Sequence, residues 1–300
     1  MLISHETPVS LLPYSWGYND YDYCLVHLLP ENQKYKDFYF KSVNYGRRVL
    51  LDNSIFELGT AFDSDQFAYW VKELRPFEYV IPDVLEDTEG TCKSMDNFLS
   101  NYSDLPGRKI GVVQGKTYQE ICECYKFVAP KVDKVAISFD YSYYLDNCDW
   151  SQINVPGFVK KQEDNKWLKY AVGRVKLLDD LYDDDVLDVG KPHHLLGASL
   201  PWEFALYSEN FLSEYIETVD TSNPIVAGIL GKRYEPEYGF CRHCAFHGFS
   251  EHFLLCFPRR LDLHCCVAAS AGMVEFHSSH RQLASRVQAA HFWLYLVQNR

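Results

Sequence analysis

Two carboxylates, Asp52 and Asp220, each end a short apolar run of the sequence, in VLLDN and TVDTS. A carboxylate pair supports displacement at an acetal-like carbon, because one attacks the carbon or stabilises an oxocarbenium ion while the other moves a proton. Four further residues follow apolar runs in the same way: Asp83, Gln114, Ser138 and Gly197. Taken singly, each is explained as well by a helix cap or a loop hydrogen bond. Their recurrence favours a common site.

The motifs that the sequence lacks narrow the chemistry. It has no GxGxxG fingerprint, no GxxxxGK phosphate loop and no GxSxG nucleophile turn. Dinucleotide binding, NTP hydrolysis and serine hydrolysis therefore lose their main support. Asp83 and Gln114 suit recognition beside the carboxylate pair, because a carboxylate accepts from N–H groups and an amide donates to a carbonyl.

The elements that must position these residues recur as an apolar run, a polar residue and an amphipathic stretch. The runs indicate strands of a parallel sheet buried on both faces, over residues 49–53, 79–83, 110–115, 135–139, 194–199 and 218–222. Helices are expected over residues 63–74, 87–99, 118–128, 164–181 and 201–212. Because a polar residue ends nearly every strand, a closed α/β barrel, the (β/α)8 TIM-type, fits better than an open sheet with one switch point. The polar residues should then meet at one mouth.

Composition divides the chain into a barrel over residues 1–240 and a Cys/His-rich C-terminal segment over residues 241–300. The second segment holds seven of the eleven His and five of the ten Cys, but no Lys. An appended segment, a tail of different origin and a reading-frame artefact each explain this break. Residues 140–165, rich in Tyr, Asp and Asn, are expected to form an excursion above the barrel.

The motifs resemble those of the tRNA-guanine transglycosylases, and most of all the shorter phage-type relatives that insert 7-deazaguanines into DNA. The likeness runs from about Leu50 to Gly231 and keeps the order of LLDNSIFELG, YVIPDVLED, GVVQG, VAISF, HLLGASLPWE and VDTSNP. It implies a barrel enzyme, a pentosyltransferase, that exchanges guanine in a nucleic acid through a covalent Asp-glycosyl intermediate. That reaction requires no cofactor.

The resemblance also implies roles for the residues. Asp220 would attack C1′, Asp52 would manage the proton of the leaving guanine, Asp83 would bind the guanine edge and Gln114 its keto oxygen. The base would also meet residues of the same motifs: Asn53, Gly115, Ser138, Phe139, Leu196 and Gly197. The incoming base would be a free 7-deazaguanine, such as 7-cyano-7-deazaguanine, which displaces the enzyme in its deprotonated form.

A target base inside a duplex must be flipped out or lie in a single strand, and stacking on an aromatic side chain commonly supports it. The candidates are Phe56, Phe139, Tyr141, Tyr143 and Tyr144, for which ordinary packing is an equal alternative. DNA is favoured over tRNA because the chain is short and lacks the Cys-x-Cys-x-x-Cys zinc pattern of the tRNA enzymes.

Cysteine and histidine spacing offers one candidate metal centre. Cys241, Cys244, His247 and His252 combine thiolates and imidazoles as a tetrahedral structural zinc ion requires. The remaining cysteines are scattered through an ordinary globular pattern, which favours reduced thiols.

The formal charge of −12 argues against non-specific nucleic-acid binding, because phosphate contacts need Lys and Arg. Local phosphate contacts are expected from basic residues near the mouth or on its rim: Arg47, Arg48, Lys116, Lys160, Lys161, Lys166, Lys169, Lys232 and Arg233. A protein partner or a homodimer is the other expected source of affinity. No window is apolar enough for a membrane helix, and the N-terminus lacks a basic start and an apolar h-region. A cytoplasmic protein is expected, in the host cytoplasm if it is phage-encoded.

Three alternatives stay open: the same exchange on tRNA, a barrel that binds a purine or modified nucleotide without turnover, and a hydrolase or deoxyribosyltransferase of free nucleosides. A requirement for a polymer substrate would exclude the enzyme of free nucleosides. Loss of exchange in Asp220→Asn would exclude the barrel without turnover, and exchange assays on tRNA and DNA would identify the polymer. His193 and His194 are expected to pack or to form hydrogen bonds rather than to catalyse.

Overall fold

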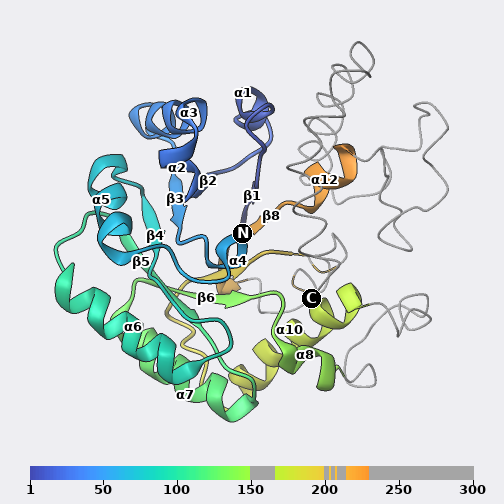
Figure 1. The fold of residues 1–300 in the computed structure, drawn as a ribbon. Helices are drawn as coiled ribbons and strands as arrows, with labels where there is room; N and C mark the ends of the chain where they lie inside the picture. Colours follow the sequence, from blue (N-terminus) through green and yellow to red (C-terminus); the bar gives the residue numbers. More distant parts are fainter. Residues whose placement is uncertain (149–165, 199–202, 204–206, 208–213, 230–300) are drawn as a thin grey trace, which may run out of the picture.

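Eight parallel strands form one sheet in the computed structural model, which describes residues 1–148, 166–198, 203, 207 and 214–229. The strand order is β1-β8-β7-β6-β5-β4-β3-β2, and the two end strands also contact each other. The sheet therefore curls into a nearly closed (β/α)8 TIM-type barrel (Figure 1). The strands are β1 (Leu2–His5), β2 (Asp22–Leu25), β3 (Val49–Asp52), β4 (Glu78–Val80), β5 (Arg108–Val113), β6 (Lys134–Ser138), β7 (His193–Leu196) and β8 (Ile216–Thr221).

Helices follow most strands and cover the outside of the barrel (Figure 1). They are α1 (Leu12–Ser15), α2 (Leu28–Glu31), α3 (Gln33–Asn44), α4 (Ile55–Leu58), α5 (Ser64–Leu74), α6 (Thr88–Asn101), α7 (Tyr118–Val128), α8 (Ser142–Asp146), α10 (Lys166–Asp183) and α12 (Asn223–Ile229), with a 3-10 turn at Ala129–Lys131. Side-chain caps begin several of them. The Asp63 carboxylate accepts the Gln66 N–H at 3.0 Å, and Thr117 and Glu120 form a reciprocal capping box on α7.

Alternate strand residues face two different cores. Leu51 packs in the layer between the strands and the helices, whereas Leu50 packs inside the barrel with Val80, Val112 and Ala136. Because side chains alternate along a strand, Asp52 points into the barrel two residues after Leu50. Because all the strand pairs are parallel, the polar residues at the strand ends lie together at the carboxyl end of the barrel, which we call the mouth.

All six predicted strands are confirmed, as are the helices predicted at residues 63–74, 87–99, 118–128 and 164–181. The helix predicted at residues 201–212 falls largely outside the described residues, and so does the segment 241–300. Within residues 140–165 the described part forms α8 and its flanks. Cys24, Cys92, Cys122 and Cys124 are free thiols, as predicted. None of the helices described combines the length and apolar character that crossing a bilayer requires.

Candidate active site

The mouth gathers the polar residues that the strand pattern predicted. Asp52 ends β3 and Asp220 lies near the end of β8. Asp83 lies three residues after β4, and Gln114 directly follows β5. The four side chains belong to residues that are only 2–6% exposed. Burial of three carboxylates at one end of a barrel is costly unless donors surround them, so the local contacts of each carboxylate define its chemistry.

Asp220 lies among hydrogen-bond donors. Its Oδ1 accepts the backbone N–H of Gly197 at 3.0 Å, and Nε2 of His194 lies 3.1 Å from the same oxygen. Glu6, which follows β1, forms a side-chain hydrogen bond to Asp220. These contacts orient the Asp220 carboxylate, the type of group that can attack an anomeric carbon as a nucleophile.

Asp52 has a different environment. The pKa of its carboxyl is raised to about 7. Burial is the main cause, and the charge of Asp220 also contributes to the increase. The Ser54 N–H, donated to Oδ2 at 2.6 Å, and a hydrogen bond from Tyr23 oppose this shift. Ser54 has φ +58°, a left-handed conformation uncommon for serine, and this turn directs its N–H at Asp52. A carboxyl with a pKa near neutrality suits a general acid and base.

Two further carboxyls at the mouth, Glu6 and Glu57, were missed in the sequence. Burial, followed by the charge of Asp220, raises the pKa of Glu6 well above its usual value. Burial and then the charge of Asp52 raise the pKa of Glu57 to about 8. Glu6 directly follows LISH, a run too short and polar to indicate a strand, and Glu57 lies in the motif LLDNSIFELG. The signal that could have found them is a glutamate shortly after a strand, directly after LISH for Glu6 and five residues after Asp52 for Glu57.

Asn53, Asp83 and Gln114 form one buried hydrogen-bonded cluster. The side-chain amides of Asn53 and Gln114 donate to the two oxygens of Asp83, each at 2.7 Å. The side-chain carbonyl oxygen of Gln114 accepts the backbone N–H of Glu86 at 2.9 Å. Each carboxylate oxygen keeps a second lone pair, and the Gln114 amide keeps a second hydrogen, so the cluster still offers an acceptor and a donor to a ligand.

Aromatic rings line one side of the mouth. The rings of Phe139 and Trp167 are stacked, with centroids 6.4 Å apart, and Phe56 lies 5.7 Å from Phe139. The tyrosine candidates have structural partners instead. The Tyr141 hydroxyl donates to the Val113 carbonyl, and Tyr144 donates to the Ser138 carbonyl at 2.9 Å.

Tyr143 also packs in the core, at 8% exposure. The ordinary-packing alternative therefore describes the three tyrosines, and Phe56 and Phe139 remain as stacking candidates.

The turn after β7 is held by a buried arginine. Gly197 has φ +67°, and a Cβ there would lie 2.5 Å from Cδ1 of Phe139. Arg174 of α10, itself fully buried, donates to the carbonyls of Leu196 at 3.0 Å and Gly197 at 2.7 Å. Burial lowers the pKa of Arg174, but Glu203, which pairs with the guanidinium, and two nearby tyrosines raise it, and the net effect is a raised pKa. Leu196 and Gly197 thus place the N–H that binds Asp220.

Ser138 and Gly115 have local roles in the described structure. The Ser138 hydroxyl donates to Asp140 at 2.9 Å. A Cβ at Gly115 would lie 2.9 Å from the backbone nitrogen of Ile121, so the glycine allows α7 to begin close to the end of β5.

The prediction that Arg47 and Arg48 lie near the mouth is wrong. They precede β3 and therefore lie at the amino end of the barrel. There Arg47 pairs with Asp22 at 2.7 Å, and Arg48 lies 3.6 Å from Glu217. Lys116, which follows Gln114, is exposed on the carboxyl side. The basic residues at 160, 161, 232 and 233 lie outside the described residues.

Lys166 and Lys169 begin α10, and the Lys166 ammonium lies 5.1 Å from the Tyr170 ring. His193 and His194 both form hydrogen bonds inside the protein, as predicted. His193 bonds the Tyr125 hydroxyl at 2.8 Å, and His194 bonds Thr218 at 2.8 Å.

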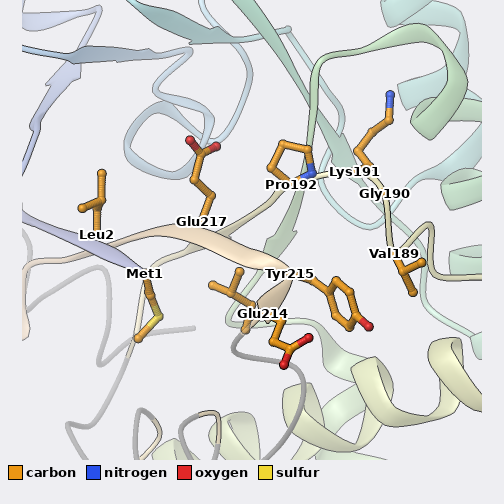
Figure 2. Close-up of a pocket in the computed structure, with 10 residues that line it drawn as sticks. Met1, Leu2, Val189, Gly190, Lys191, Pro192, Glu214, Tyr215 and Glu217 are labelled. Atoms are coloured by element: carbon orange, nitrogen blue, oxygen red, sulfur yellow. The ribbon is translucent and has the colours of Figure 1, made fainter.

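A hollow of about 420 Å³ opens at the amino end of the barrel, beside the beginnings of β1 and β8 (Figure 2). Its lining includes Leu2, Lys191, Tyr215 and Glu217, and none of its lining residues is a predicted site residue. Within the part of the chain that the structure describes, no group of His, Cys, Asp and Glu has a metal-binding arrangement. The predicted zinc ligands Cys241, Cys244, His247 and His252 lie outside that part.

Comparison with known proteins identifies no family for the chain. No family model matches the chain, and no curated protein matches it. One solved structure that it resembles is a mandelate racemase/muconate lactonizing enzyme-like protein from Rubrobacter xylanophilus, at 12% identity and a TM-score of 0.43. The match covers 80% of this chain and spans 58% of that protein's length. A likeness of this size carries no argument about activity.

Proposed function

We propose that the protein is a base-exchanging transglycosylase that replaces a guanine of a nucleic acid by a free 7-deazaguanine. The observation that carries this proposal is the pair Asp52 and Asp220, buried at one barrel mouth in unlike environments. Asp220 accepts the Gly197 N–H and lies beside Nε2 of His194, whereas burial raises the pKa of Asp52 to about 7. Carboxyls whose surroundings differ in this way suit the separate roles of nucleophile and acid–base.

The first step breaks the bond between C1′ and N9 of the target guanine. A carboxylate oxygen of Asp220 forms the new bond to C1′, and protonated Asp52 gives its proton to the leaving purine. In the second step Asp52 takes the N9 proton of the incoming base. That nitrogen then displaces Asp220 from C1′, which restores both carboxyls and retains the configuration.

The cluster of Asn53, Asp83 and Gln114 supports recognition of a guanine-like base. A guanine edge has N–H groups that match the free lone pairs of Asp83, and a keto oxygen that matches the remaining Gln114 hydrogen. The rings of Phe56 and Phe139 lie 5.7 Å apart at the same mouth and offer a stacking surface for a flipped base.

The test is incorporation of radiolabelled guanine and of 7-cyano-7-deazaguanine into duplex DNA, single-stranded DNA and tRNA. We expect wild-type protein to label DNA, and Asp220→Ala and Asp52→Ala to abolish or strongly reduce labelling. Asp37→Asn, an exposed carboxylate of α3, serves as the control that retains activity. Labelling of tRNA alone would replace the DNA substrate by tRNA, and no labelling of any polymer would refute the function.

Labelling must also depend on a polymer. Incorporation into free guanosine or deoxyguanosine at equal rates would instead indicate a nucleoside-level transferase. Binding of a purine that survives Asp220→Asn, without exchange in the wild type, would indicate a non-catalytic binding barrel.

A further inference from the structure

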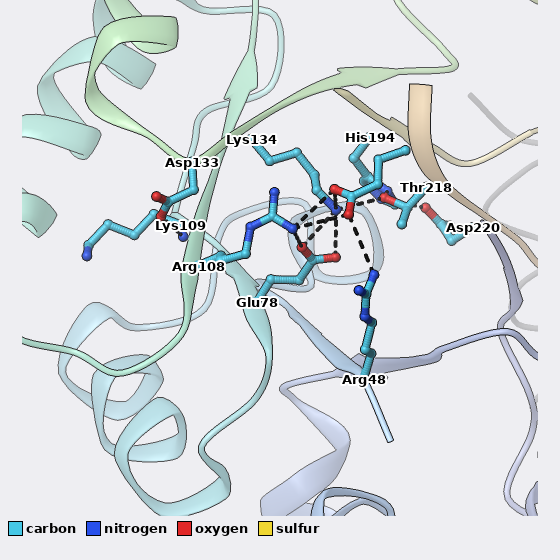
Figure 3. Close-up of polar contacts among 10 residues, drawn as sticks. Arg48, Glu78, Arg108, Lys109, Asp133, Lys134, His194, Thr218 and Asp220 are labelled. Atoms are coloured by element: carbon cyan, nitrogen blue, oxygen red, sulfur yellow. Dashed lines mark hydrogen bonds and ion pairs between the residues drawn. The ribbon is translucent and has the colours of Figure 1, made fainter. Parts of the chain in front are cut away.

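His194 lies next to Asp220 and belongs to a chain of polar side chains inside the barrel. It is fully buried on β7, and Thr218 is 2% exposed on the neighbouring strand β8. Nδ1 of His194 lies 2.8 Å from Oγ1 of Thr218, and Nε2 lies 3.1 Å from Oδ1 of Asp220. Figure 3 shows Thr218 and His194 between Lys134 and Asp220.

The buried ammonium of Lys134 sets the direction of these hydrogen bonds. It donates to Glu78 Oε1 at 2.8 Å and to Thr218 Oγ1 at 3.1 Å, and it lies 3.0 Å from Glu217 Oε2. An ammonium group has three hydrogens and no acceptor, so these three groups use all of its donors. Thr218 therefore accepts from Lys134, and its own hydrogen is left for Nδ1 of His194.

A His194 ring that accepts at Nδ1 carries its proton on Nε2, which faces Asp220. Among the described residues, Nε2 has no acceptor in full hydrogen-bond alignment, although Asp220 Oδ1 is only 3.1 Å away. A buried donor without an aligned partner is unfavourable, so a small rotation of the Asp220 carboxylate that completes this bond is stabilising.

We propose that His194 is a positioning residue for Asp220, a neutral imidazole whose Nε2–H is directed at the carboxylate by the Lys134–Thr218 pair. Together with the Gly197 N–H, it holds Oδ1 and so orients the Asp220 carboxylate for attack on C1′. This role rests on the proposed transglycosylase function, whereas the tautomer of His194 is a property of the protein without substrate. The two are therefore tested separately.

The tautomer is tested by nitrogen-15 NMR of histidine-labelled full-length protein near neutral pH. We expect Nδ1 of His194 to appear unprotonated and Nε2 protonated, with the signal assigned by its loss in His194→Gln. Thr218→Val removes the donor to Nδ1 and should move the Nδ1 chemical shift away from its hydrogen-bonded value, whereas Thr218→Ser keeps the wild-type pattern. A protonated Nδ1 in the wild type, or an Nδ1 chemical shift that is the same in Thr218→Val as in the wild type, would overturn the proposal.

The positioning role is tested by the kinetics of base exchange. His194→Leu should lower kcat by about tenfold to hundredfold, the loss of one hydrogen bond to a charged group, with little change in KM. His194→Gln, which keeps an N–H donor at the end of the side chain, should recover part of that loss. His193→Gln is the matched control, because His193 packs on Tyr125 outside the barrel interior.

The outcomes separate the two hypotheses. Exchange by the wild type with an unchanged kcat in His194→Leu overturns the positioning role alone. Absence of exchange by the wild type refutes the transglycosylase function and the positioning role together, even where the tautomer is as expected.

Discussion

The buried carboxyl of Asp52 makes the folded protein hold a proton that the unfolded chain has released. Its pKa is about 7 in the fold against an ordinary value of 3.8. Between these two pH values the folded state binds more protons than the unfolded state, so stability falls as pH rises. Such a cost is tolerated at sites where chemistry needs an unfavourable group.

Replacement of Asp52 by Asn should therefore stabilise the protein in a pH-dependent way. At pH 8 we expect Asp52→Asn to raise the free energy of unfolding by on the order of 2 kcal/mol, because the variant buries no charge there. Near pH 4 the wild-type carboxyl is protonated in the fold, and the difference should become small. Urea denaturation at both pH values measures this. Asp37→Asn should show no such pH dependence, and an equal effect of Asp52→Asn at pH 4 and pH 8 would contradict the assignment.

The turn after β7 contains Gly197, which packs against Phe139 and also binds the Asp220 carboxylate on β8. Gly197 combines φ +67° with a close approach to Phe139, and its N–H binds Asp220 on β8. Only glycine satisfies the backbone angle and the contact together. The buried Arg174 of α10 holds the carbonyls of this turn, so α10 also contributes to the geometry of the nucleophile.

Gly197→Ala should lower both stability and activity. The left-handed backbone angle costs about 1 kcal/mol with a Cβ, and displacement of the Phe139 ring adds to this. We expect base exchange to fall by about tenfold or more because the donor to Asp220 moves. Gly46→Ala is the matched control, since Gly46 has φ +75° with no atom within 4 Å of the added Cβ. Thermal unfolding and labelled-base incorporation distinguish them, and equal losses in both variants would show that the contact with Phe139 is unimportant.

The longer elements were predictable because their patterns are local. The helix predicted at residues 118–128 has the bounds of α7, where a capping box and a clear amphipathic face coincide. β1 was missed because a four-residue strand with polar Ser4 and His5 gives no apolar run, and β2 because only its last three residues are apolar. The site residues were predictable to the same extent. Asp52 and Asp220 could be predicted because they end apolar runs, whereas Glu6 could be recognised only from the pairing of β1 with β8.

At the scale of the whole molecule, ion pairs join several strands at the amino end of the barrel (Figure 3). Lys134 of β6 pairs with Glu78 of β4 at 2.7 Å and with Glu217 of β8 at 3.0 Å. Arg108 of β5 and Arg48 before β3 reach the same Glu217. Side chains far apart in the sequence meet here only because the sheet curls, so no local pattern predicted this network.

Lys134→Met should destabilise the barrel by about 3–5 kcal/mol, because it leaves the buried Glu78 with only its longer contact to Arg108, at 3.6 Å. The double variant Lys134→Met with Glu78→Met should lose much less, since neither charge remains to be buried. Urea denaturation of the two single variants and the double variant measures the coupling. A double variant as unstable as the sum of the single variants would contradict a paired, buried network.

The central claim is that Asp220 forms a covalent bond to the nucleic acid, and mass spectrometry of quenched reactions tests it most directly. Wild-type protein mixed with a guanine-containing DNA oligonucleotide, without incoming base, should gain the mass of the oligonucleotide less guanine. Peptide mapping should place this adduct on Asp220, and Asp220→Asn should form none. Base exchange by the wild type without such an adduct, or an adduct on a different residue, would contradict the account.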